Sequence, residues 1–172
     1  LERDERPAEA IQAFNRAAEL LANPYRPLTR LGLYARREGN DQEAMQYYFR
    51  AVRAAPDRAT TAANNLADMI LESEQNSSLA LALAWVANAN NDYVRFKPDI
   101  ADTLCRALIR TGNATLALHA ATVAARAEPE DAGRQLRLGI ARLASGQQGK
   151  AVKALEKTLD IAPEGAHAER AR

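Results

Sequence analysis

The sequence predicts an all-α fold, a solenoid of antiparallel helix pairs, on three observations. The first is a fixed repeat period of about 34 residues, which is typical of helix–turn–helix arrays. The second is a small residue at matching places in the two helices of each unit, where a neighbouring helix can approach closely. The third is the abundance of Ala, the strongest helix former. Residues that recur at this period are Leu104 and Leu138, Gly112 and Gly146, Ala117 and Ala151, and Pro129 and Pro163.

The first expected element is a helix over residues 7–22, with Pro7 in its first turn, where a proline costs no hydrogen bond. Several of its residues stand one repeat period before those of a later second helix. These pairs are Ala10 and Ala44, Phe14 and Tyr48, and Ala17 and Ala51. The helix is therefore predicted to be the second of a pair whose first helix is missing, and we expect the chain to be a piece of a longer array.

Four helix pairs are expected to follow, each with a short turn between its two helices. After the last closing Pro, the polar tail either begins a further helix or frays. In order, the expected features are helices over 25–38 and 41–54 around Gly39, helices over 59–74 and 79–90, a third pair that begins at Pro98 and turns at Gly112, and a fourth that begins at Asp131 and turns at Gly146.

The first full pair also carries a Leu-Gly dipeptide, an Ala followed four residues later by an aromatic residue, and a closing Pro. These residues are Leu31, Gly32, Ala44, Tyr48 and Pro56. The pattern resembles the tetratricopeptide repeat family, and its bacterial type of array in particular. The resemblance implies a right-handed α-solenoid of about four hairpins after a leading half repeat. It treats the chain as one solenoid, 1–172, made of a half repeat 7–24, repeats 25–58, 59–97, 98–131 and 132–165, and a tail 166–172.

One segment breaks the period. The spacing from Pro56 to Pro129 exceeds two repeat periods, and part of the excess falls between Asn88 and Pro98. Insertions in a solenoid form loops on one face, often a binding face. The alternative is an ordinary loop in which Tyr93 and Phe96 pack against helix ends.

Composition limits the classes of partner. The net charge is +1, so no overall field favours nucleic acid, and no apolar run is long enough to insert into a membrane. The single Cys105 excludes an internal disulfide, and its place among the small packing residues predicts a buried, inert thiol. The location, cytoplasmic or periplasmic, stays open.

The sequence contains no recognisable catalytic motif. There is no Gly-rich phosphate loop after a strand, no zinc-binding His-Glu-x-x-His pattern and no pair of cysteines. We therefore expect no enzyme activity, no cofactor and no metal site.

The resemblance implies that the first helix of each pair lines a concave groove that holds a peptide or helix of a partner protein. Arg side chains there suit carboxylates, and an Asn amide suits a peptide backbone. The alternatives are that these charges form solvated ion pairs with neighbouring helices, and that the apolar residues of the last repeat are packed by the tail or by a further repeat. The candidate groove residues are Arg26, Arg30, Arg37, Asn64, Asp68, Asp102, Arg106, Arg110, Leu136 and Ile140, with Thr29, Leu33, Leu71, Asp99 and Leu143 on the same faces.

Members of the family that hold the carboxyl terminus of heat-shock chaperones use a clamp of Lys, Asn and Arg. This chain has Thr29 and Leu33 where a Lys and an Asn are expected, and Asp99 and Thr103 where Lys and Arg are expected. We therefore do not expect a chaperone-tail clamp.

Three functions fit these observations. The first is a non-catalytic scaffold that binds a protein partner of unknown identity. The second is self-assembly into a homo-oligomer through the open end of the array or the face at Leu136. The third is the repeat arm of a bacterial envelope or exopolysaccharide export machine, to which the runs 64–67 and 102–104 are similar.

Overall fold

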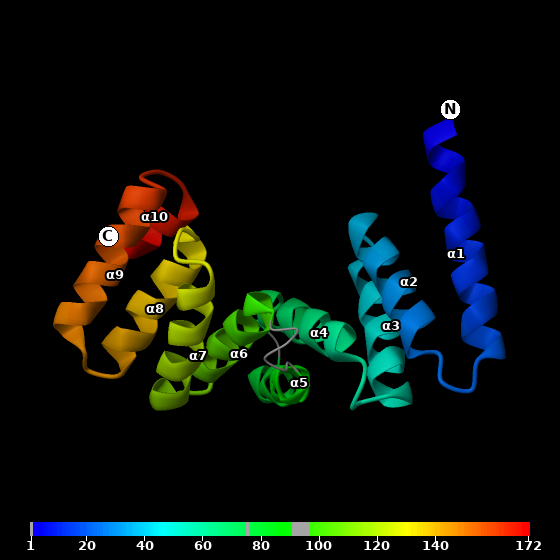
Figure 1. The fold of residues 1–172 in the computed structure, drawn as a ribbon, viewed down its shortest axis with the longest axis horizontal. Helices are drawn as coiled ribbons and strands as arrows, with labels where there is room; N and C mark the ends of the chain where they lie inside the picture. The colour runs from blue at the N-terminus through cyan, green and yellow to red at the C-terminus, as the bar shows by residue number, and fades with distance from the viewer. Residues whose placement is uncertain (1, 75, 91–96) are drawn as a thin grey trace.

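The computed structural model describes residues 2–74, 76–90 and 97–172, and within these ranges the chain forms ten helices and no strands (Figure 1). None of the described helices is both long and apolar enough to cross a bilayer. The helices are α1 Glu2–Leu20, α2 Tyr25–Arg37, α3 Asp41–Ala54, α4 Thr60–Glu72, α5 Ser77–Ala89, α6 Pro98–Arg110, α7 Ala114–Ala127, α8 Ala132–Ala144, α9 Gln148–Ile161 and α10 Ala166–Ala171.

Consecutive helices pack into hairpins, which confirms the predicted all-α solenoid. The most closely packed pairs are α2 with α3, α4 with α5, α6 with α7 and α8 with α9. Three of the turns use a glycine with a positive φ, 78° at Gly39, 77° at Gly112 and 74° at Gly146. Residues with a Cβ rarely adopt this conformation, so glycine lets each hairpin reverse at once after its first helix.

The helices form two layers that differ in spacing. The first helices contact one another in series, from α2 to α4, α6, α8 and α10. Within the described residues, the second helices α1, α3, α5, α7 and α9 make no such contacts with each other. When helices are closely spaced in one layer and widely spaced in the other, the array curves toward the closely spaced layer. The first helices therefore form the inner layer, and Figure 1 shows α4 beside α6 with α5 on their outer side.

Two glycines set how closely the helices of a hairpin approach. A Cβ on Gly32 would lie 2.5 Å from the ring of Tyr48, and one on Gly139 would lie 2.5 Å from the side chain of Leu155. Tyr48 is fully buried, and so are Ala67 and Cys105. The small residues therefore make room for a large side chain from the paired helix.

The two ends of the chain differ from the expectations. The first helix begins at Glu2, so Pro7 lies beyond the first turn and the prediction that it starts the helix is wrong. The tail forms α10, which packs on α8 and α9 and buries Ala168 and Ala171, so it does not fray. The predicted loop residues Tyr93 and Phe96 lie outside the described residues.

Candidate functional site

Two adjoining hollows run along α2 and form one groove. The first, about 530 Å³, extends to the start of α4, and the second, about 460 Å³, reaches the end of α2. Both are lined by Arg30 and Leu33, so we treat them as one surface, the α2 groove. The first is lined by Tyr25, Arg26, Thr29, Arg30, Leu33, Arg58, Ala59, Thr61 and Lys97, and the second by Arg30, Leu33, Tyr34, Arg36 and Arg37.

The α2 groove is basic. Among the described residues, no Asp or Glu lines either hollow. The guanidinium carbons of Arg26 and Arg58 lie 5.7 Å and 5.9 Å from the centre of the Tyr25 ring, within the range of cation–π contact. Arg26 Nε also donates a hydrogen bond of 2.9 Å to the Tyr25 hydroxyl. Tyr25 thus holds two of the arginines in place without neutralising their charge.

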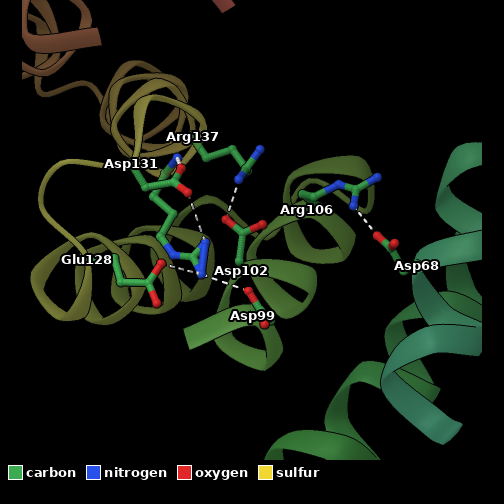
Figure 2. A network of polar contacts seen from close by, with 8 residues as sticks. Asp68, Asp99, Asp102, Arg106, Glu128, Asp131 and Arg137 are labelled. Carbon is green, nitrogen blue, oxygen red and sulfur yellow. Dashed lines mark hydrogen bonds and ion pairs between the residues drawn. The ribbon is translucent and has the colours of Figure 1, made fainter. Parts of the chain in front are cut away.

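The middle of the inner layer is different, because ion pairs join α4 to α6 and α6 to α8 (Figure 2). Arg106 of α6 pairs with Asp68 of α4, and Arg137 of α8 pairs with Asp102 of α6. Two further pairs follow the same pattern, Arg36 to Glu72 at 2.9 Å and Arg110 to Glu74 at 3.4 Å.

For four of the predicted groove charges, these contacts are those that the ion-pair alternative expects. Asp68, Asp102, Arg106 and Arg110 are engaged by neighbouring helices. Asp102 is only 9% exposed, and burial raises the pKa of its carboxyl although Arg137 acts in the opposite direction. This carboxylate is therefore a link between helices and not an open ligand for a partner.

The remaining predicted residues lie in varied surroundings. Arg26, Arg30 and Arg37 are exposed and line the α2 groove. Asn64 is half-buried on α4, and its Oδ1 is a buried acceptor for which the described residues supply no hydrogen-bond donor. Asn64 lines neither hollow of the α2 groove.

The apolar residues of the last repeat that were predicted for the groove differ in exposure. Leu136 is 1% exposed, so the helix turns it into the core, as the packed alternative expects. Ile140 is half-buried, and only Leu143 of these three, 48% exposed, is open to solvent. Leu71, predicted for the second repeat, is also 1% exposed and forms no part of an open surface.

Sequence reasoning missed Arg134, which lies at the centre of an ion-pair cluster. Its guanidinium is 2.7 Å from Asp99 of α6, 2.9 Å from Glu128 in the loop after α7, and 3.6 Å from Asp131 (Figure 2). The i,i+3 spacing of Asp131 and Arg134 is the one local signal of this cluster, because the other two partners lie farther away in the chain.

Arg58 and Lys97 were also missed, since they lie outside the predicted helices. Each stands just before a first helix, α4 or α6, at the place where one repeat ends and the next begins. Both side chains line the hollow at the start of α2. Their place at a repeat boundary is visible in the sequence, but the direction in which each turn points its side chain is not.

Cys105 is fully buried on α6, and burial, with a contribution from Asp102, raises the pKa of its thiol to about 12. Because the thiolate is the reactive form, we expect the folded protein to resist a thiol-specific disulfide reagent at pH 8. The thiol should react fully once urea unfolds the chain. The absorbance of the thiolate that the reagent releases measures the extent of reaction in both states. Rapid reaction in the folded state would contradict this assignment.

Comparison with known proteins agrees with the geometry. Residues 25–58 match the model of a family described as tetratricopeptide repeat. A search of curated proteins finds no match. Solved structures do match, at identities from 18% to 21%, and at this level the likeness is one of fold.

Three of these structures illustrate the likeness. MamA from Desulfovibrio magneticus is 19% identical, with a TM-score of 0.69 over 94% of this chain and 88% of that one. TTC0263, a tetratricopeptide repeat protein of Thermus thermophilus, is 21% identical, with a TM-score of 0.60 over 81% and 75%. Cut9, in a hetero-tetramer with Hcn1, is 18% identical, with a TM-score of 0.72 over 94% of this chain and 31% of that one. Residues 25–58 therefore match a tetratricopeptide repeat, and the fold of the described chain is like that of solved tetratricopeptide repeat proteins.

Proposed function

We propose that the chain is a non-catalytic scaffold that holds a segment of a partner protein in the α2 groove. The observation that carries the proposal is the continuity of the two hollows along one inner helix. A surface of this length, with apolar Leu33 between basic side chains, suits a short peptide or one face of a helix. The matching array of Cut9 belongs to a complex with Hcn1, which supports a protein partner.

We propose two roles for the predicted groove residues. Arg26, Arg30 and Arg37, which line the α2 groove, are proposed to contact the bound segment. The ion-paired residues Asp68, Asp102, Arg106 and Arg110 hold successive first helices together. The inner layer is then a rigid support that needs little rearrangement when a segment binds.

A peptide-display selection on the intact chain tests the proposal. Peptides that bind the wild type should bind Leu33→Glu at least about tenfold more weakly, because the new carboxylate removes the apolar contact at the centre of the groove. Fluorescence anisotropy with the synthesised peptides measures the dissociation constants.

Leu116→Glu is the matched control, since Leu116 is 47% exposed on α7 of the outer layer and Leu33 is 36% exposed. If both variants lose affinity for the peptides equally, or if neither loses affinity, the groove is not the binding site. Self-assembly and a role in an envelope machine stay predictions from the sequence.

A further inference from the structure

The hollow at the start of α2 brings together three arginines that have no carboxylate partner among the described residues. Arg26, Arg30 and Arg58 all line it and are exposed. Within the described residues, none of the three pairs with a carboxylate. We call this set the arginine hollow. Three guanidinium groups around one open space repel each other and favour an anion between them.

This arrangement differs from the rest of the inner layer. There, Arg36, Arg106 and Arg137 each pair with a carboxylate of the adjacent first helix. Within the described residues, these three inner-face arginines have carboxylate partners and the three at the start of α2 do not. The contrast indicates that the missing negative charge comes from outside this set of residues.

The ends of two helices add to the field of the arginines. Tyr25 begins α2, and Thr61 lies in the first turn of α4, and both line the hollow. Neither helix has an acidic residue in its first turn or a side chain that caps it. Unpaired backbone N–H groups and the positive ends of the helix dipoles therefore lie on the same side as the guanidinium groups.

The shape and surroundings select among anions. About 530 Å³ is more than one carboxylate fills, and the hollow opens into the second part of the groove beside Leu33 and Tyr34. A chain that enters both parts would place acidic side chains at the arginines and an apolar side chain at Leu33. Planar guanidinium groups bind carboxylates through two parallel hydrogen bonds.

We infer that the arginine hollow is a carboxylate-binding subsite, so that the partner segment is an acidic peptide with an apolar residue beside its acidic run. This inference rests on the proposed function, whose groove it specifies. The arginines recognise the charge, and Leu33 with Tyr34 recognises the apolar neighbour.

Two labelled peptides test the inference by fluorescence anisotropy with the intact chain. One carries a run of glutamates followed by leucine and tyrosine, and in the other every glutamate is replaced by glutamine. We expect binding of the glutamate peptide only, weakened by added salt because the pairing groups are exposed. Arg30→Gln and Arg58→Gln should each weaken it about tenfold, the effect of losing one charge-assisted contact.

Arg126→Gln is the control, because Arg126 is an exposed arginine of α7 away from the hollow. Equal binding of the two peptides, equal loss in Arg126→Gln, or binding only when phosphoserine replaces the glutamates would overturn the carboxylate assignment. A third result separates the two proposals. If the displayed peptides are neutral, bind Leu33→Glu more weakly and bind Arg30→Gln and Arg58→Gln as tightly as the wild type, the groove is a binding site but its partner is not acidic. Circular dichroism of each variant shows that the fold is kept.

Discussion

Replacement of Tyr48 by alanine should lower the free energy of unfolding by about 3–5 kcal/mol, the loss typical of a large buried aromatic residue. Tyr48 is 0% exposed and is the largest of the described side chains that are fully buried. Its ring fills the space above Gly32, and its hydroxyl accepts a hydrogen bond of 3.2 Å from Asn65. Urea unfolding followed by circular dichroism measures the change.

Two companion variants separate the ring from the hydroxyl. Tyr48→Phe removes the hydrogen bond alone and should cost about 1 kcal/mol. Gly32→Ala should destabilise the wild type by about 1–3 kcal/mol, because the new methyl group meets a ring that has no room to move. In the Tyr48→Ala background the same change should cost little, and strict additivity of the two losses would show that Gly32 and Tyr48 are not packed as described.

Replacement of Arg134 by methionine should lower the free energy of unfolding by about 2 kcal/mol, less than the roughly 3–5 kcal/mol of a broken, fully buried pair. The side chain of Arg134 is 7% exposed, and it links α6, the loop after α7 and the start of α8 through three carboxylates. Methionine retains most of the buried volume but leaves Asp99, Glu128 and Asp131 to repel each other. The loss is moderated because these carboxylates stay partly in water.

Arg126→Met provides the comparison, because it removes an arginine that is exposed, and we expect a change within about 0.5 kcal/mol. Urea unfolding is measured with and without 1 M salt, at which the Debye length is about 3 Å. The difference in unfolding free energy between the wild type and Arg134→Met should be smaller in high salt, because the salt screens the ion pairs of Arg134. An Arg134→Met variant as stable as the wild type would mean that the buried guanidinium, whose Nε has no hydrogen-bond partner among the described residues, costs as much as its ion pairs contribute.

The candidate site was only partly predictable. Arg26, Arg30 and Arg37 follow from their place on a first helix, because the repeat assigns that helix to the inner layer. Arg58 does not, since it lies in a turn whose direction depends on how two hairpins meet. The sequence also left open whether Leu136 is packed or exposed, because a shift in helix rotation of one residue moves it between the surface and the core.

Local features of the chain are enough to specify the helices, their pairing and their order. These features recur at a fixed period, and they are turn glycines, small residues and prolines that end helices. Which charges of the inner layer are paired and which are open became known only from the packed array. The partners Arg36 and Glu72 are 36 residues apart, Asp68 and Arg106 are 38 apart, and Asp102 and Arg137 are 35 apart. Such pairs depend on the rotation and offset between neighbouring repeats, which packing sets and a repeat pattern does not specify.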